Sequence, residues 1–171
     1  MTYHELFEIY TEQITALAKA GADLLVVETM LGIDEMTVAL EAAQSVCALP
    51  VLCSMTVQAD GSGYFGGTCV EAVETLQELG AAAVGINCST GPDQLESLVR
   101  NMRQAAKVPL LVKPNAGMPE ISPEGEAIYS MGPEAFAQHM RTLIDAGAAL
   151  VGGCCGTNPR YISALRDVLP R

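Results

Sequence analysis

The sequence predicts an α/β fold in which parallel strands follow one another in sequential order, with a helix between each strand and the next. Segments with apolar residues at helical spacing alternate along the chain with short, continuous apolar runs. Such continuous runs are typical of buried parallel strands. The 171 residues, half of them apolar, fit one domain over residues 1–171. They are too few for a complete eight-fold β/α barrel, which takes roughly 250 residues.

The elements can be placed in order along the chain. One helix comes first, and five strand-helix units follow it. The predicted helices are residues 4–20, 34–47, 68–79, 93–106, 133–146 and 159–169. The predicted strands are residues 24–27, 51–57, 82–86, 110–112 and 149–151. The longest irregular stretches, residues 59–67 and 114–132, both follow strands, where long loops are commonly functional.

Three of the joints between a helix and the next strand share one pattern. Gly21, Gly80 and Gly147 each close a helical segment and are followed at once by a buried apolar run. We expect each glycine to adopt the left-handed conformation that ends a helix. The pattern therefore indicates repeated units within one domain.

Charge and hydropathy exclude several classes of protein. The formal net charge is -11, and no cluster of Lys or Arg could neutralise phosphates, so nucleic acid is not expected as a partner. No apolar run approaches the roughly 20 residues that span a bilayer, and the first ten residues are polar and acidic, unlike a signal peptide. We therefore expect a cytoplasmic protein without membrane contact. In that reducing compartment the six cysteines are expected to be metal ligands, catalytic thiols or core residues.

The carboxyl ends of the predicted strands carry the residues with chemical potential. Glu28, Cys88 and Cys154 follow the three joint glycines at equivalent distances, and Cys155 comes directly after Cys154. Asn115 follows the strand after Cys88. Because the carboxyl ends of parallel strands meet at one edge, we expect one carboxylate, three thiols and one carboxamide to converge there.

Three cysteines from two strand ends suit an open zinc site, in which a fourth position is left for water or substrate. A substrate thiol bound there would lose its proton near neutral pH and stay nucleophilic. The chemistry that this predicts is alkyl transfer to sulfur. The other reading of Cys154 and Cys155 is a vicinal disulfide, which needs a strained geometry and an oxidising compartment. The three remaining cysteines are expected to be small buried residues: Cys47, Cys53 and Cys69.

For several residues a purely structural role is an alternative to a functional one. Glu28 could be a strand-end carboxylate paired with a nearby base, and Asn115 could simply support a turn. His4 and His139 lie on helices among polar neighbours, so neither is expected to bind a metal. The glycine pattern over residues 61–66 lacks the strand-helix context and the acidic residue of a dinucleotide site. We therefore interpret it as a flexible loop at the rim of the sheet. If this loop has a function, we expect it to be a lid over the site.

Two motifs carry a family resemblance. The segments Gly-Ile-Asn-Cys-Ser over residues 85–89 and Gly-Gly-Cys-Cys-Gly-Thr over residues 152–157 resemble the homocysteine-binding domain of homocysteine S-methyltransferases, including the first module of cobalamin-dependent methionine synthase. Further matches lie at residues 23–30, 91–92 and 114–119. The resemblance spans nearly the whole chain.

The resemblance implies a (β/α)8 barrel of TIM type whose three cysteines bind Zn²⁺, which binds and activates the homocysteine sulfur. Cys88, Cys154 and Cys155 would be the ligands, and Asn115 would approach the fourth position when homocysteine is absent. Glu28 would hold the homocysteine amino group, and Asn87 is placed with it among the substrate-binding residues. The activity implied is transfer of a methyl group to homocysteine, which forms methionine.

The chain departs from the family in length. In the family the strand that carries the equivalent of Glu28 is the fourth of eight, so the resemblance implies about five βα units, without the first three. Two hypotheses follow: a methyltransferase completed by a missing segment, a partner chain or self-association, or a zinc-binding fragment with no turnover. Family members use methyltetrahydrofolate through cobalamin, S-methylmethionine, S-adenosylmethionine or betaine. The methyl donor stays open, with the loop over residues 59–67 leaning toward the cobalamin-linked members.

Overall fold

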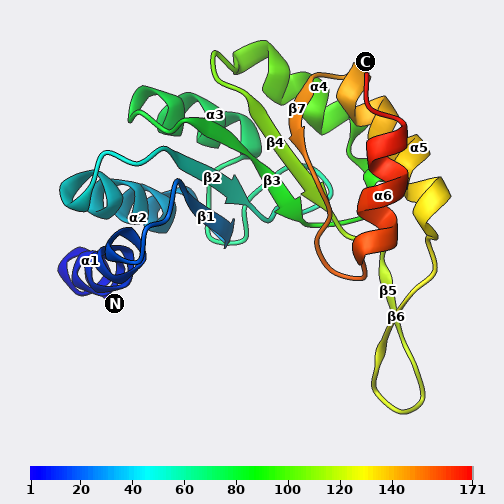
Figure 1. Ribbon diagram of the computed structural model, residues 1–171, viewed down its shortest axis with the longest axis horizontal. Helices are drawn as coiled ribbons and strands as arrows, with labels where there is room; N and C mark the ends of the chain where they lie inside the picture. Colours follow the sequence, from blue (N-terminus) through cyan, green and yellow to red (C-terminus); the bar gives the residue numbers. More distant parts are fainter. Residues whose placement is uncertain (171) are drawn as a thin grey trace.

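The computed structural model describes residues 1–170 and alternates strands with helices (Figure 1). The strands are β1 (Leu25–Met30), β2 (Val51–Met55), β3 (Ala83–Cys88), β4 (Leu110–Pro114), β5 (Pro119–Ile121), β6 (Ala127–Tyr129) and β7 (Ala148–Val151). The α-helices are α1 (Tyr3–Lys19), α2 (Ile33–Val46), α3 (Cys69–Glu78), α4 (Glu96–Ala105), α5 (Pro133–Asp145) and α6 (Pro159–Asp167), and a short 3-10 helix, η1 (Pro92–Gln94), precedes α4.

Five strands form one parallel sheet in the order β1-β2-β3-β4-β7 (Figure 1). Each strand therefore pairs with the next main strand along the chain, as the sequence predicts. The first and last strands, β1 and β7, each have a sheet neighbour on one side only within residues 1–170. This is the α/β fold of a TIM-type barrel, represented by five of its strands.

The hydrophobic core lies between the helices and one face of this sheet. Strand residues at alternate positions, such as Val84 and Ile86 of β3, pack in the core with residues from the helices. The residues between them face the other side, where Val26 of β1 and Leu150 of β7 are 44% and 38% exposed. The sheet thus has a covered face, which holds the fold together, and an inner face that is partly open.

Local sequence explains where the helices begin and end. Thr2 starts α1 and Thr68 starts α3, each with a glutamate three residues later that completes a capping box. The joint glycines behave as predicted, because Gly21, Gly80 and Gly147 have φ angles of 89°, 92° and 119°. Each joint therefore turns sharply from a helix into the following buried strand.

One element was not predicted. The stretch between β4 and α5 contains an antiparallel hairpin of β5 and β6, which extends away from the sheet (Figure 1). Its strands have three residues each, and most of those residues are exposed. Such short strands without a buried face leave no alternating hydrophobic pattern for sequence analysis to find.

The glycine-rich stretch after β2 forms a series of hydrogen-bonded turns. The Gln58 N–H donates to the Ser62 carbonyl at 2.8 Å, the Gly63 N–H to the Gly67 carbonyl at 2.8 Å, and the Phe65 N–H to the Leu31 carbonyl at 3.0 Å. The last of these bonds ties the loop to the segment after β1.

Within residues 1–170, no helix combines the length and the apolar character that crossing a membrane requires.

Candidate metal centre

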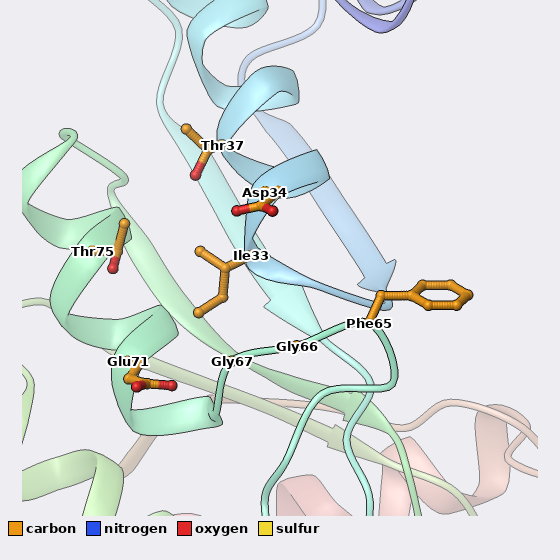
Figure 2. A pocket seen from close by; sticks show the side chains of 8 residues that line it. All are labelled: Ile33, Asp34, Thr37, Phe65, Gly66, Gly67, Glu71 and Thr75. Atoms are coloured by element: carbon orange, nitrogen blue, oxygen red, sulfur yellow. The ribbon is translucent and has the colours of Figure 1, made fainter. Parts of the chain in front are cut away.

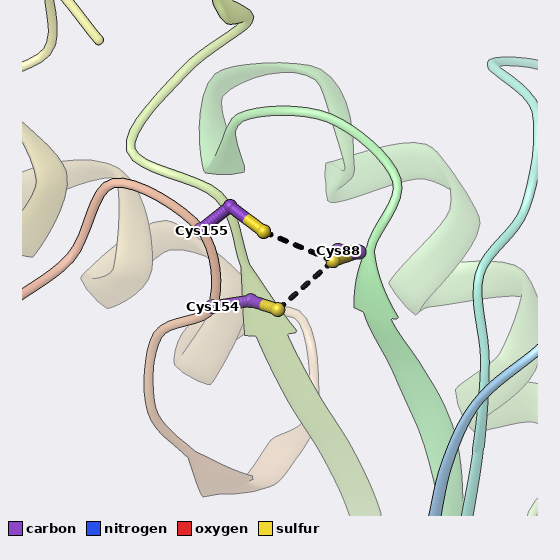
Figure 3. A group of neighbouring side chains, drawn as sticks. All are labelled: Cys88, Cys154 and Cys155. Carbon is purple, nitrogen blue, oxygen red and sulfur yellow. Dashed lines mark hydrogen bonds between the residues drawn. The ribbon is translucent and has the colours of Figure 1, made fainter. Parts of the chain in front are cut away.

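The three cysteines of the two motifs meet beyond the carboxyl ends of β3 and β7, the strands on either side of β4. Cys88 is the last residue of β3, whereas Cys154 and Cys155 lie in the loop after β7. The Cys88 Sγ is 2.9 Å from the Cys154 Sγ and 3.6 Å from the Cys155 Sγ (Figure 3). All three sulfur atoms lie within 4.8 Å of one another, and all three cysteines are free. The predicted convergence of the three thiols is therefore present.

The backbone around the thiols holds them in place. The Cys154 N–H donates to the Pro114 carbonyl at 2.8 Å, and the Ala116 N–H donates to the Cys155 carbonyl at 2.9 Å. These bonds fasten the cysteine loop to the end of β4. Cys88 itself has a φ angle of 56°, in the left-handed region that non-glycine residues rarely adopt. Such backbone strain is common where a structure positions functional side chains.

The thiols of Cys88 and Cys154 differ in how readily they lose a proton. Burial, followed by the hydrogen bonds and charges of Cys154 and Cys155, raises the pKa of the Cys88 thiol to about 12. Burial also acts to raise the pKa of Cys154, but hydrogen bonds from Cys88, Asn87 and the Cys155 backbone outweigh it and lower that pKa below its usual value. Cys154 therefore loses its proton more readily than Cys88.

The donor set fits a zinc ion. Zn²⁺ binds thiolate sulfur at about 2.3 Å in tetrahedral geometry, which separates two sulfur ligands by about 3.8 Å. The separations of 2.9 Å and 3.6 Å from the Cys88 Sγ are shorter than that value, and all three sulfur atoms lie within 4.8 Å, so small side-chain movements would bring the thiols to zinc-ligand spacing. The three cysteines leave a fourth position free of protein thiols. Sulfur ligands also favour zinc over magnesium or calcium.

Asn87 is buried at the centre of a hydrogen-bond network beside the thiols. Its side-chain oxygen accepts hydrogen bonds from the Thr29 N–H at 2.8 Å and the Ser54 hydroxyl at 2.7 Å. Its Nδ2 donates to the Thr29 hydroxyl at 2.7 Å and to the Cys154 Sγ at 3.8 Å. The residue is 1% exposed. Asn87 therefore joins β1, β2 and the cysteine loop, and its predicted contact with substrate stays a prediction.

Glu28 lies within β1 and pairs with a base from across the sheet. Its Oε2 contacts the Nζ of Lys113, a residue of β4. The plainer reading of Glu28, a strand carboxylate paired with a nearby base, thus describes the chain without substrate. Its role in holding a substrate amino group stays a prediction.

Asn115 follows β4 directly and takes part in fixing the cysteine loop. Its Oδ1 accepts a hydrogen bond from the Cys155 N–H at 3.1 Å, and its own N–H donates to the Thr90 carbonyl at 3.1 Å. A carbonyl oxygen has two lone pairs, so this bond leaves one for a metal. Asn115 therefore fixes the cysteine loop, while the predicted support of its own turn and its ligation of a metal stay predictions.

Two residues near the centre escaped sequence analysis. Sequence analysis assigned no role to Lys113, because no pattern in the sequence indicates that its side chain contacts β1. Tyr129 ends the unpredicted hairpin, and its ring lies directly over Gly156, where a Cβ atom would be 2.3 Å from the ring carbon Cγ. Burial, and then the negative charge of the nearby Cys155, raise the pKa of the Tyr129 hydroxyl. Without the hairpin, no sequence signal brings this tyrosine to the cysteines.

The other cysteines and both histidines lie away from the centre, as predicted. Cys53 is fully buried in β2, where burial raises the pKa of its thiol to about 12. Cys69 is buried at the first turn of α3, as predicted. Cys47 directly follows α2 and is only half-buried, so its predicted burial is incomplete. His139 is exposed on α5. None of these side chains joins the cluster of three thiols.

A separate cavity of about 410 Å³ lies between the first turns of α2 and α3 (Figure 2). Gly66 and Gly67 of the glycine-rich loop contribute to its wall, together with the acidic side chains of Asp34 and Glu71. Figure 2 shows the Phe65 ring pointing away from this cavity. The lining contains no cysteine, so the cavity is distinct from the thiol cluster.

A sequential parallel sheet that gathers three thiols beyond its strand ends defines a β/α-barrel type of protein with a candidate thiolate metal centre. Comparison with known proteins narrows this class. The family model described as homocysteine S-methyltransferase matches residues 1–169, and the chain belongs to that family.

Individual relatives agree with this assignment. The chain is 30% identical over 175 residues to methionine synthase of Mycobacterium leprae and 31% identical over 166 residues to methionine synthase of Mycobacterium tuberculosis. These alignments cover 99% and 94% of the chain. The crystal structure of the homocysteine methyltransferase MmuM from Escherichia coli, in its apo form, superposes with a TM-score of 0.80 at 25% identity over 99% of the chain.

The chain is much shorter than these relatives. It spans 14% of each of the two methionine synthases and 58% of the Escherichia coli MmuM chain. What those whole proteins do is therefore treated below as a proposal for this chain.

Proposed function

We propose that the chain carries the zinc and homocysteine site of a methyltransferase that forms methionine. The observation that supports this most strongly is the cluster of three free thiols from two strand ends, all within 4.8 Å, in a member of the homocysteine S-methyltransferase family. The proposed ligands are Cys88, Cys154 and Cys155, with Asn115 as the fourth ligand when substrate is absent.

Bound at these residues, zinc would supply a Lewis acid that lowers the pKa of a substrate thiol while three thiolate ligands keep that sulfur nucleophilic. In the reaction, the homocysteine sulfur forms a bond to the methyl carbon, the bond between that carbon and the donor breaks, and the thiol proton is released. The protein's contribution is orientation of the reacting sulfur.

Three residues near the thiols have separate proposed roles. Glu28, on β1, is proposed to bind the substrate ammonium group. Asn87 is proposed to keep β1 and Cys154 in a fixed relation, because its amide bonds both. Asn115 is proposed to hold the cysteine loop through the Cys155 N–H.

A second candidate is a metal-binding unit that has no turnover by itself. The observations that favour it are the open edges of β1 and β7 and the partly exposed inner face of the sheet. In that case the neighbours of these edges would come from another segment, a partner chain or a second copy. The methyl donor, methylcobalamin loaded from methyltetrahydrofolate or another, would be held by other modules.

Binding and turnover separate the two candidates. We expect the zinc-loaded chain to bind L-homocysteine in calorimetry, and we expect the metal-free chain to bind it far more weakly. Formation of methionine from homocysteine and a methyl donor then supports the enzyme, whereas binding without methionine supports the metal-binding unit. A zinc-loaded chain that does not bind homocysteine would contradict the proposed substrate.

A further inference from the structure

An ion pair crosses the inner face of the sheet next to the thiols. The ammonium group of Lys113 on β4 contacts the Glu28 carboxylate on β1, so the pair reaches over β2 and β3. Among the ion pairs described within residues 1–170, it is the only one that joins two strands. Lys113 is also the only Lys or Arg in any described strand.

Both side chains lie on the face opposite the core. Val27 and Val112, which directly precede them, pack against the core. Successive strand residues point to opposite faces, so Glu28 and Lys113 point away from the core. Lys113 is paired in register with Asn87, the residue that donates to Cys154. The ion pair and the thiol cluster therefore share the carboxyl end of one face.

The surroundings bring Lys113 close to the cysteine loop. The next residue, Pro114, pairs in register with Cys88, and its carbonyl accepts the Cys154 N–H. Gly152 leaves room for the lysine stem, because a Cβ atom there would be 3.3 Å from the Lys113 Cγ. The side chains of Lys113 and Glu28 remain 25% and 45% exposed, so a small molecule can reach both charges.

Resting on the proposed function, we propose that Lys113 is a specificity-determining residue that binds the α-carboxylate of an amino-acid thiol while Glu28 binds its α-ammonium. An α-amino acid carries an ammonium and a carboxylate on one carbon. A carboxylate and an ammonium in direct contact on the protein present the complementary pair. The substrate zwitterion would insert between them, and each protein charge would exchange its partner for one on the substrate.

Electrostatics favours this exchange. A partly buried charge without a partner is costly, and the Glu28–Lys113 pair avoids that cost before substrate arrives. After the exchange every charge is still paired, so net charge at the site does not change. The chain has a formal charge of -11, which opposes the approach of a substrate carboxylate. Lys113 supplies the positive charge that a carboxylate needs on this face.

The alternative role for the pair is structural, as a strap that holds β1 and β4 in position. The two roles differ in which ligand they affect. A strap would influence every thiol ligand equally, whereas a carboxylate-binding lysine affects only ligands that carry a carboxylate. Two ligands that differ by this group therefore separate the roles: L-homocysteine, and 3-aminopropane-1-thiol, which lacks the carboxylate.

The experiment measures dissociation constants of both thiols on the zinc-loaded chain by calorimetry. The unchanged chain is expected to bind L-homocysteine about 10-fold to 100-fold more tightly than 3-aminopropane-1-thiol, the range of a hydrogen bond to a charged group. The Lys113→Met variant is expected to lose that preference while its affinity for 3-aminopropane-1-thiol stays equal or rises. Lys113→Arg, which keeps the charge, should retain most of the preference.

Lys107→Met is the matched control, because Lys107 is an exposed lysine outside the strands, and it should behave like the unchanged chain. Equal losses for both thiols in Lys113→Met, or no loss for homocysteine, would overturn the inference and leave the proposed function intact. An unchanged chain that binds homocysteine and 3-aminopropane-1-thiol equally would overturn it without any variant. A zinc-loaded chain that binds neither thiol overturns the proposed function and this inference together.

Discussion

At the scale of single residues, the thiols of Cys88 and Cys154 do not ionise alike. Burial and hydrogen bonding raise the pKa of Cys88 to about 12, so its thiol is protonated at neutral pH when no metal is bound. Zinc binds thiolates, so Cys88 must give up its proton when the metal enters. Cys154, whose pKa is lowered, ionises more readily and is expected to bind the metal first.

Zinc binding is therefore expected to release at least one proton, from Cys88. Because the proton is lost on binding, the apparent zinc affinity should rise with pH, by about tenfold per pH unit for each proton released. Calorimetric titrations of the metal-free chain in two buffers with different ionisation enthalpies measure the proton count. Binding heats that are the same in both buffers would mean that no proton leaves and would refute this view of Cys88.

Sequence analysis found the proposed ligand residues but could not find their hydrogen-bond and ion-pair partners. The alternation of strands and helices places Cys88 and Cys154 after strand ends at one edge of the sheet, and the structure confirms that their thiols lie together there. The contacts of Glu28 and Asn87 depend on side chains that cross two or three strands. Lys113 is separated from Glu28 by 85 positions, so no local pattern links them.

At the scale of elements, the pairing of β3 with β4 sets the position of Cys88 relative to the cysteine loop. These strands approach unusually closely at Gly85, where a Cβ atom would be 1.7 Å from the Leu111 carbonyl oxygen. Only glycine fits there without moving a strand. The glycine of the Gly-Ile-Asn-Cys segment therefore has a packing role three residues before the ligand.

Gly85→Ala is expected to destabilise the chain by about 3 kcal/mol, because the added methyl group must push β3 and β4 apart. Equilibrium unfolding in denaturant measures the free energy of unfolding. Gly132→Ala is the control, since nothing lies within 4 Å of the added Cβ atom, and it should cost no more than about 1 kcal/mol. Equal stability of the two variants would show that β3 and β4 do not approach as described.

The elements also show what sequence patterns capture and what they miss. Long amphipathic helices and buried strands bury many apolar residues, so their spacing predicts them well. The β5–β6 hairpin has no such pattern, and with it sequence analysis missed Tyr129 beside the cysteines. The glycine-rich loop was interpreted as flexible, but the order in its turns comes from backbone hydrogen bonds, which leave little trace in the side chains.

At the scale of the whole molecule, the sheet ends in two strands that each have one free edge within residues 1–170. Free edges of parallel strands present unpaired backbone groups, and the inner face beside them carries exposed apolar side chains. The 171-residue chain by itself is therefore expected to associate. Sedimentation velocity should show species larger than the monomer, in proportions that rise with protein concentration.

A matched pair of variants tests the origin of this association. Val26→Lys places a charge on the exposed face of edge strand β1 and should shift the chain toward the monomer. Ile128→Lys places the same charge on the exposed β5–β6 hairpin, which extends away from the sheet (Figure 1), and should not. A chain that stays monomeric at all concentrations would contradict the prediction.

The central claim is that Cys88, Cys154 and Cys155 together bind one zinc ion, and metal content measures it most directly. After exposure to zinc and removal of the excess, elemental analysis should find one zinc per chain in the unchanged protein and in Cys47→Ser, which alters a cysteine outside the cluster. Cys88→Ser should retain well under half of that amount, because only two thiolates remain. Zinc far below one per chain in the unchanged protein, or equal zinc in Cys88→Ser and Cys47→Ser, would contradict the account.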